Sequence, residues 1–554
     1  MARERWLDVG WFLLVVATSS FAAFTAGQRL GATFDEPAHI DAGLKCWRSG
    51  SYKPLMRWGA MPLPIDVQTL PIYLWERYRG EPFEPYLQMH ELIPVARAAS
   101  LPFWWLLLFY GSRWGRLLGG PWAGRLACGF LATDPNLLGH AALATTDLCL
   151  TATVLMATFH FFTNRESGWW WRVFVPGLLY GVALTAKASA LPYVPLLGLV
   201  FGIYHLIQTG QWTGGRDWRK ATARLRWDLV TMMAIGFVYL FAYCGCDWAT
   251  EPSFMAWAHS LPEGPNRDAM VTISERLCIF TNGGEGLVQQ IKHNMRGHDG
   301  TFVAGELHPK AVWYYYPVAL SIKLADPTLL LLLAVLVIRP RALLTPAGWA
   351  VLVLLIFSLN TRVQIGVRLV FPLVAFLHLA LAVAVCRASD NGRFFETPLN
   401  VLRVFAMLCV VGCAVECATV WPDGVRFTNQ LWGSTDRGHE RLADSNYDWG
   451  QGLPELAEWQ REHADRPLFV WYYGGDPAVL KSPFVHLPVH LMPQPGVGEV
   501  KQQVGNGYFA VSLTLLSACP DRRPEVVAVI DWLKGRTPVA HTGTFFIYDL
   551  REAP

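Results

Sequence analysis

The chain has 554 residues, of which 53% are hydrophobic, 13% are aromatic and only 16% are charged. This composition, with 25 tryptophans, is typical of a polytopic membrane protein and excludes a soluble enzyme. The net charge of +3 is too small, and the basic residues are too scattered, for a nucleic-acid-binding surface. We therefore expect membrane lipids among the partners and no nucleic acid.

Eleven apolar segments are long enough to be membrane-spanning helices, each of which needs ~20 mostly apolar residues. They lie near residues 9–27, 96–112, 121–140, 144–163, 172–188, 191–208, 227–245, 313–338, 344–360, 366–386 and 401–420. We expect the first segment to be retained as a signal anchor, because many spans follow it. The predicted fold class is thus a polytopic α-helical membrane protein with about eleven transmembrane helices.

Basic connections between these segments predict the orientation. With Arg3 and Arg5 on the cytoplasmic side, the connections after even-numbered spans fall on that same side. These connections read "SRWGRLLGG", "TNRESGWWWR", "GGRDWRKATARLR", "RPRALL" and "CRASDNGR". The sequence therefore predicts a multi-pass protein of the cell (inner) membrane, with a cytoplasmic N-terminus and an extracytoplasmic C-terminal part.

Two domains follow from this topology. Residues 1–420 are predicted to form the transmembrane domain, with large extracytoplasmic loops at 28–95 and 246–312. Residues 421–554 are predicted to form a small extracytoplasmic α/β domain. In that tail, "LPELAEWQREH" and "PEVVAVIDWLKG" have helical patterns, whereas "RPLFVWYYGG", "GYFAVSLTLL" and "GTFFIYDL" are typical of strands.

Ionisable residues gather at the predicted outer boundary of the membrane. The acids are Asp35 and Glu36 after the first span and Asp147 at the start of the fourth. The cations at the same boundary are Arg97, Lys187, Lys323, Arg362 and Arg368. An ionisable residue at membrane depth costs ~2.5 to 3.5 kcal/mol on insertion scales and usually marks a substrate path.

This mixture of charges suits the attack of an acceptor hydroxyl on a sugar that is carried by a lipid phosphate. A carboxylate takes the hydroxyl proton as general base, and cations stabilise the charge that grows on the departing phosphate. We therefore expect catalytic acids at Asp35, Glu36 and Asp147, and phosphate-binding cations at the five positions above. His39 and His298 are expected beside the acceptor or in the loops around it.

Each of these residues also has a structural explanation. The acid pair at 35 and 36 fits a solvated helix end, and Asp147 fits a helix N-cap. Lys187 and Lys323 fit side chains that reach lipid headgroups, and the two arginines at 362 and 368 fit a solubilised loop. His39 and His298 also fit structural roles.

The tail motif "DSNYDWGQGLPE" has the oxygen-ligand spacing of a calcium loop. Asp444, Asn446, Asp448 and Glu455 occupy positions 1, 3, 5 and 12 of that pattern, but Trp449 stands where the loop requires glycine. We favour a structural loop, in which the acids cap turns and Trp449 packs the tail onto the membrane domain.

Several stretches together resemble the GT-C membrane glycosyltransferases of the family 39 type, which use a polyprenyl-phosphate sugar donor. Within that group they resemble bacterial relatives of protein O-mannosyltransferases and of the lipid A aminoarabinose transferase. The matching stretches, from residue 33 to about 455, are "TFDEPAHIDAG", "RAASLPFWWLLL", "LATDPNLLGHAALATTDLCLTATVLM", "GVALTAKASAL", "MRGHDGTFVAGELHPKAVWYYYPVALSIKLADP", "QIGVRLVFP" and "LADSNYDWGQGLPEL".

The resemblance implies a GT-C fold and specific residue roles. Asp35 matches the family's catalytic base, Glu36 matches its second acid, and Asp147 looks like the acid that opens the fourth helix. Cations near the donor phosphate are implied at Arg97, Lys187 and Arg368. One departure is "GAMPLPIDV", which lacks the basic residue that many relatives carry before two prolines and a leucine in the first loop.

The leading interpretation is an inverting glycosyltransferase that moves a sugar from a polyprenyl-phosphate carrier to a protein, lipid or glycan acceptor. We expect no obligate cofactor, and a divalent cation remains open because paired carboxylates bind such ions. The alternative is a transporter or flippase of a lipid-linked sugar, although the sequence lacks the paired halves common in transporters. An inactive scaffold of the same fold is a third interpretation.

Overall fold

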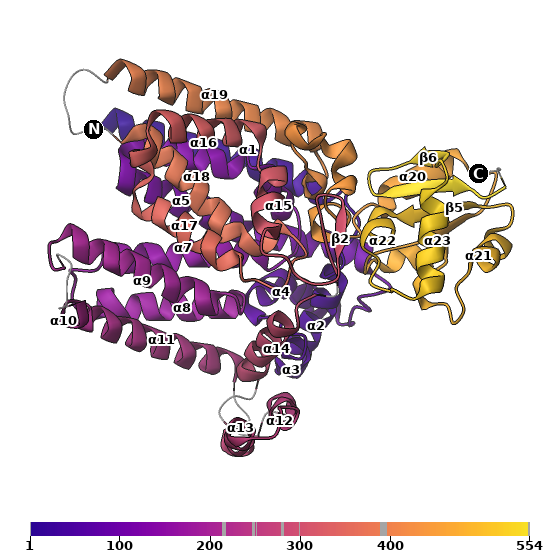
Figure 1. Ribbon diagram of the computed structural model, residues 1–554, viewed down its shortest axis with the longest axis horizontal. Helices are drawn as coiled ribbons and strands as arrows, with labels where there is room; N and C mark the ends of the chain where they lie inside the picture. The colour runs from indigo at the N-terminus through magenta and orange to yellow at the C-terminus, as the bar shows by residue number, and fades with distance from the viewer. Residues whose placement is uncertain are drawn as a thin grey trace.

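The protein is described by a computed structural model that covers residues 2–212, 218–245, 250, 252–278, 282–298, 300–387 and 396–551. A bundle of long helices occupies one end of the molecule, and an α/β domain occupies the other (Figure 1). The N-terminus lies at the far end of the bundle, and the C-terminus lies in the α/β domain. The predicted membrane fold with a small C-terminal α/β region is confirmed.

The bundle contains the apolar helices α1 (Ala2–Gly27), α5 (Met89–Ala132), α7 (Asp147–Thr163), α8 (Val175–Ala186), α9 (Ala190–Gln208), α11 (Ala223–Cys244), α15 (Tyr315–Lys323), α16 (Asp326–Ile338), α17 (Pro346–Ser358), α18 (Phe371–Cys386) and α19 (Glu396–Val420). Within the described ranges, six helices are long and apolar enough to cross a membrane, or seven if α15 and α16 form one span. Each of the eleven predicted segments overlaps one of these helices, but α7, α8 and α17, with 17, 12 and 13 residues, are shorter than a full span.

Three predicted spans differ from the observed helices. Segments 96–112 and 121–140 both fall largely within α5, which is interrupted at Gly120 with φ 81° and ψ −173°. The predicted eighth span, 313–338, bends by 113° between α15 and α16. Pro327 explains the bend, because its ring would clash with the Lys323 carbonyl in a continuous helix. That carbonyl instead accepts a hydrogen bond from the Asn136 side chain at 2.5 Å.

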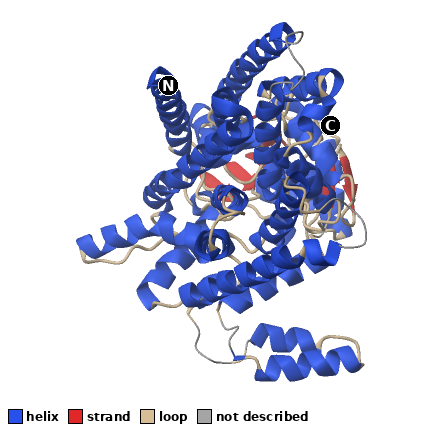
Figure 2. Cartoon of the chain, turned by 90° about the vertical axis from the view of Figure 1, so that its left-hand side faces the viewer, coloured by secondary structure: helices blue, strands red, loops and turns tan. Residues whose placement is uncertain are grey.

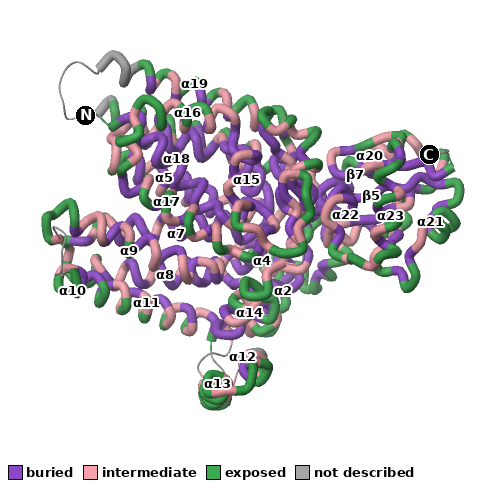
Figure 3. Tube along the Cα trace, viewed as in Figure 1, coloured by how far each residue is buried: buried purple, intermediate pink, exposed green. Residues whose placement is uncertain are grey.

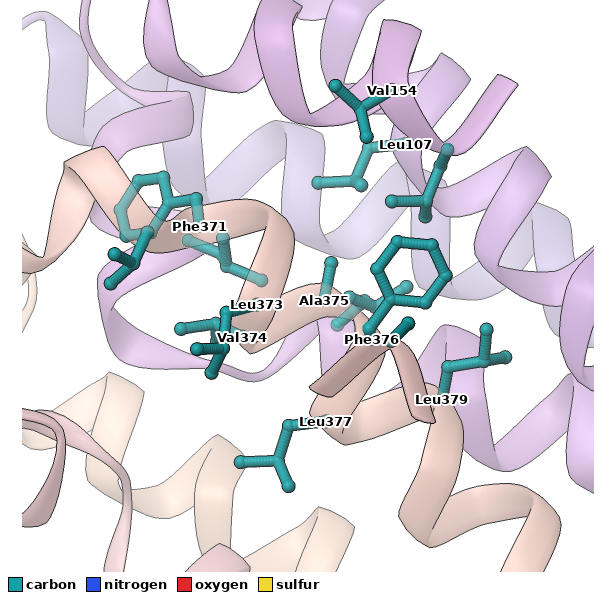
Figure 4. Packing of buried hydrophobic residues seen from close by; sticks show 14 of the residues in the cluster. Leu107, Val154, Phe371, Leu373, Val374, Ala375, Phe376, Leu377 and Leu379 are labelled. Atoms are coloured by element: carbon teal, nitrogen blue, oxygen red, sulfur yellow. The ribbon is translucent and has the colours of Figure 1, made fainter. Parts of the chain in front are cut away.

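Helix α18 lies at the centre of the bundle, and all of its sixteen residues are buried. Figure 4 shows its side chains packed against Leu107 of α5 and Val154 of α7. An apolar surface on every side is what a helix surrounded by other helices requires. The short helix η4 (Val367–Val370), which leads into α18, therefore has a fixed position in the molecule.

Shorter elements cover the end of the bundle that faces the α/β domain (Figure 1). They are α2 (Glu36–Ser49), α3 (Lys53–Met56), α4 (Pro62–Arg79), α6 (Pro135–Ala141), α14 (Gly283–Arg296) and the antiparallel strands β1 (Thr301–Val303) and β2 (Glu306–His308). Helices α12 (Pro252–His259) and α13 (Pro265–Arg276) lie side by side at the edge of the molecule (Figures 1 and 2). At the opposite end of the bundle, α10 (Trp218–Ala221) precedes α11.

The tail contains a five-stranded sheet with strand order β4-β3-β5-β7-β6. Its strands are β3 (Leu468–Trp471), β4 (Phe484–His486), β5 (Tyr508–Ser512), β6 (Ala540–His541) and β7 (Phe545–Asp549). Strand β3 pairs in parallel with β4 and β5, whereas β7 is antiparallel to β5 and β6. The central strand β5 is buried along its whole length (Figure 3).

Four helices accompany the sheet, namely α20 (Leu453–Glu462), α21 (Val497–Val504), α22 (Leu513–Ala518) and α23 (Pro524–Lys534). Buried residues of α23, including Val529 and Leu533, pack with Phe509 and Val511 of β5 in one apolar cluster. This cluster gives the tail a hydrophobic core that is separate from the core of the bundle.

Candidate active site

Arg368 lies at the centre of a cluster of charged side chains at the end of the bundle that faces the α/β domain. Its side chain is only 8% exposed, and its Nη1 donates to Asp35 Oδ2 at 3.2 Å and to Asp147 Oδ2 at 3.3 Å. These residues come from η4, from the loop before α2 and from the start of α7. The structure therefore brings together three residues that the sequence placed at one membrane boundary.

Lys187 extends the cluster from the other side of Asp147. Its Nζ donates to Asp147 Oδ1 at 2.5 Å. Lys187 is the residue at which α8 ends, with extended backbone angles, whereas Asp147 is the first residue of α7. The Asp147 side chain is completely buried, and each of its two oxygens pairs with a cation. The N-terminus of α7 also favours its negative charge.

Asp35 is the accessible acid of the cluster. Its side chain is 32% exposed, in contrast with the fully buried Asp147. Asp35 precedes α2, yet its side chain makes no capping hydrogen bond. Within the described ranges only Oδ2 accepts a hydrogen bond, which leaves Oδ1 open to a substrate hydroxyl.

His39 lies one helical turn after Asp35, and its backbone N–H donates to the Asp35 carbonyl at 3.0 Å. Its Nδ1 is buried and has no hydrogen-bond partner among the described residues. Burial lowers the pKa of His39 below its ordinary value, and although Asp35 opposes this shift, Arg368 and Lys187 reinforce it. The imidazole is therefore neutral at neutral pH and is surrounded by the charged cluster.

Glu36 and Arg97 form a closed pair instead of facing a substrate. Arg97 donates to both Glu36 oxygens and to the carbonyls of Gly27, Leu30 and Gly31. Both side chains are at most 3% exposed. This differs from the predicted catalytic role of Glu36 and phosphate-binding role of Arg97, because every N–H group of the guanidinium is already used inside the protein.

The remaining bonds of Glu36 explain why it is charged. Its oxygens also accept from the Thr33 and Ala144 backbone N–H groups, at 2.8 and 2.7 Å. Burial raises the pKa of Glu36, but Arg97 and these N–H groups outweigh burial, and the net pKa lies below the ordinary value. Glu36 thereby fixes the loop that carries Asp35.

Lys323 also differs from its predicted role. It is 2% exposed, and its Nζ donates to the carbonyls of Val425, Phe427 and Asn446. An ammonium has three donors, so none is left for a phosphate. Lys323 instead holds the segment that leads from α19 into the tail.

Arg362 and His298 lie outside the cluster. Arg362 is exposed, and its Nη1 donates to the Met295 carbonyl at 3.0 Å. The ring of His298 lies 6.4 Å from that of His293. Across the described part of the chain, no hydrogen bond or ion pair joins either residue to Arg368, and their roles stay predictions.

Two residues of the tail that the sequence analysis did not place at the site hold Arg368. Its Nε donates to Ser445 Oγ at 3.0 Å, and its guanidinium lies over the Trp449 ring at 4.0 Å from the ring centre. Trp449 is buried beside Leu143 and Val425, so it packs the tail onto the membrane domain as expected. The motif "DSNYDWG" was the available signal, but its spacing pointed to turn capping.

The described residues contain no group of three or more His, Cys, Asp or Glu side chains that could hold a metal ion. In the tail motif, Asp444 accepts from the Tyr473 hydroxyl at 2.7 Å, and Asn446 accepts from the Val367 backbone N–H at 3.0 Å. Asp448 accepts from the backbone N–H groups of Gly450 and Thr514. These side chains are thus engaged by the protein.

No protein-family model matches the sequence, and no curated protein matches it. The structure is similar to that of ArnT from Cupriavidus metallidurans in the apo state, with 14% identity, a TM-score of 0.46 and 97% of each chain covered. The same protein bound to undecaprenyl phosphate matches with 16% identity, a TM-score of 0.43 and 97% of each chain covered. The Archaeoglobus fulgidus oligosaccharyltransferase matches with 10% identity and a TM-score of 0.41, over 91% of this chain and 70% of that one.

Proposed function

We propose that the protein is an integral membrane glycosyltransferase that moves a sugar from a polyprenyl-phosphate carrier to an acceptor hydroxyl outside the cytoplasm. The observation that carries the proposal is the cluster of Asp35, Arg368, Asp147 and Lys187. It combines an accessible carboxylate with two cations at the outer end of a membrane bundle. Such charges are costly at membrane depth and mark functional sites.

In the proposed reaction, Asp35 accepts the proton of the acceptor hydroxyl, whose oxygen attacks the anomeric carbon of the sugar. The bond from that carbon to the phosphate oxygen breaks, and its electron pair leaves with the polyprenyl phosphate. A single attack from the face opposite the phosphate gives inversion. Arg368 and Lys187 supply the positive charge that stabilises the departing phosphate.

Asp147 has a supporting role in this proposal. Because it binds both Lys187 and Arg368, it keeps the two cations a fixed distance apart and balances their charge while no donor is bound. Within the described part of the chain, no hydrogen bond uses Arg368 Nη2, which leaves a donor for a phosphate oxygen. Arginine is well suited to this task because its planar fork matches phosphate geometry.

The proposal requires no obligate metal, because Arg368 and Lys187 provide the charge that a divalent cation would supply. It leaves open whether the acceptor is a protein, a lipid or a glycan.

The polyprenyl chain stays in the bilayer, and we place the site on the extracytoplasmic side with the N-terminus in the cytoplasm. Protease added to intact spheroplasts should then cleave the tail, whereas protection of the tail would reverse this orientation.

The test is a transfer assay with purified protein, a radiolabelled polyprenyl-phosphate sugar and candidate acceptors. Asp35→Asn should lower the rate by ~10² to 10⁴, as expected for a lost general base. The matched control is Asp41→Asn, since Asp41 lies on α2, which begins directly after Asp35, but pairs with the exposed Lys45. Wild-type rates in Asp35→Asn would refute the mechanism.

The same assay tests the metal requirement. We expect transfer to continue in EDTA, and a loss of transfer that Mn²⁺ or Mg²⁺ restores would contradict the metal-free mechanism.

A further inference from the structure

The loop that carries Asp35 is bound to the tail domain through its backbone. Three N–H groups just before Asp35 donate to tail acceptors: Gly31 to the Gln451 carbonyl at 2.9 Å, Ala32 to Asp476 Oδ2 at 2.8 Å, and Phe34 to the Trp449 carbonyl at 2.9 Å. Loops with so many backbone bonds have little freedom to move. The position of Asp35 is therefore set by residues more than 400 positions away in the sequence.

Side chains and a glycine close the same contact. The ring of Phe34 stacks on that of Tyr473, with ring centres 5.4 Å apart. Gly475 touches the loop so closely that a Cβ atom built on it would lie 2.5 Å from the Phe34 carbonyl oxygen. Because that neighbour is backbone, any side chain at position 475 must push the loop or the tail aside.

The tail also holds the cation opposite Asp35. Ser445 Oγ accepts from Arg368 Nε and donates to the Ile365 carbonyl at 2.6 Å, so its proton is committed and its lone pair faces Arg368. The Trp449 ring covers one face of the guanidinium. One short stretch of the tail, residues 445–451, thus contacts both the loop that carries Asp35 and the side chain of Arg368.

We propose that the tail domain is a positioning element for the transfer step, with Ser445, Trp449, Gly475 and Asp476 as its positioning residues. The inference rests on the proposed function. The tail fixes the separation of base and phosphate-binding cation, while the membrane bundle alone supplies the chemical groups. A misplacement of about 1 Å at such a site costs on the order of 10²-fold in rate.

The first test inserts a methyl group into the contact. Gly475→Ala in the full-length protein should lower kcat by about 100-fold and change the donor KM by less than about twofold, because the base moves while the donor site remains. The matched control is Gly498→Ala in the same domain, where a Cβ meets no atom within 4 Å.

The second test removes the Asp476 carboxylate, which accepts from the Ala32 N–H and also from the Ala478 N–H, and it does not depend on activity. Asp476→Ala deletes the acceptor of the Ala32 N–H, and hydrogen–deuterium exchange of residues 31–34 should become about tenfold faster. Asp521→Ala is the control, because Asp521 also accepts a backbone N–H in the tail but, among the described residues, its side chain binds only Arg523. Asp476→Asn, which keeps one acceptor oxygen, should recover part of the protection.

The outcomes separate the two proposals. If Asp35→Asn abolishes transfer but Gly475→Ala keeps the wild-type kcat, the positioning role is wrong and the proposed function stands. If the wild-type protein transfers no sugar, the proposed function fails, and the exchange experiment alone decides whether the tail fixes the loop. Unchanged exchange in Asp476→Ala, with the tail still folded, would overturn the inference.

Discussion

Arg97 and Arg368 put the same side chain to two different uses at one membrane boundary. Every N–H group of the Arg97 guanidinium donates to Glu36 or to a loop carbonyl, so Arg97 has a structural role. Arg368 divides its bonds between acids of the site and a serine of the tail. The difference lies in their partners and not in burial, since both side chains are less than a tenth exposed.

This distinction gives a prediction for Arg97. Arg97→Met leaves Glu36 buried without its cation, and breaking a buried pair in this way costs ~3 to 5 kcal/mol. The expected result is a markedly lower Tm of the detergent-solubilised protein, whereas Arg362→Met, at an exposed arginine, should leave Tm unchanged. An unchanged Tm combined with lost donor binding would return Arg97 to the phosphate site.

At this scale the sequence predicted which residues gather but not what each one binds. Hydropathy placed Asp35, Asp147, Lys187 and Arg368 at one boundary, and the structure joins them. Hydropathy could not separate Lys323 from this group. The partners of its ammonium are backbone carbonyls, and a pattern of side chains does not show which carbonyls lie close to a lysine. Ser445 was missed for a related reason, since its role depends on tail docking.

Among the elements, α5 shows how one glycine divides two predicted spans. Gly120 has φ 81° and ψ −173°, a region that is nearly restricted to glycine. A Cβ built there meets no atom within 4 Å, so space does not require the glycine. Only the backbone conformation at position 120 requires glycine.

Gly120→Ala therefore should destabilise the protein through backbone strain by ~1 to 3 kcal/mol. The measurement is thermal unfolding in detergent. The control is Gly168→Ala, where a Cβ also meets nothing within 4 Å and φ is not positive. Equal Tm values for the two variants would show that the break in α5 absorbs a side chain without cost.

Element prediction succeeded where patterns are long. The sequence located the helices at 453–463 and 524–535 and the strands β3, β5 and β7, because each carries a clear apolar period. Strands β4 and β6, with three and two residues, are too short for any alternation to register. The second half of "GYFAVSLTLL" was predicted as strand but forms α22, since an apolar run by itself does not distinguish strand from helix.

On the scale of the whole molecule, the junction between bundle and tail contains a buried acid that forms no ion pair with any described residue. Asp448 is fully buried, and burial raises its pKa to about 7, although the N–H groups of Thr514 and Gly450 oppose the shift. Between about pH 4 and 7 the folded protein therefore holds a proton that the unfolded chain, in which the carboxyl has its ordinary pKa of 3.8, has already released. Folding is thus favoured at low pH and loses stability as the pH rises towards 7.

The expected slope is at most about 1.4 kcal/mol per pH unit between these two pKa values. Asp448→Asn should flatten the pH dependence of Tm from pH 5 to 8 relative to wild type. Asp465→Asn, at an exposed tail position, should leave the wild-type curve unchanged. Parallel curves for wild type and Asp448→Asn would show that the buried carboxyl does not titrate with folding.

The hydrogen bond from Ala32 to Asp476 joins residues 444 positions apart, so the donor is synthesised well before its acceptor. At roughly 5 to 20 residues per second, the ribosome completes the acceptor roughly 20 to 90 s after the donor. During that interval the first helices are already synthesised, but the loop that carries Asp35 lacks its hydrogen-bond partners in the tail. Under the proposed function, a prematurely terminated chain therefore lacks the contacts that position the base.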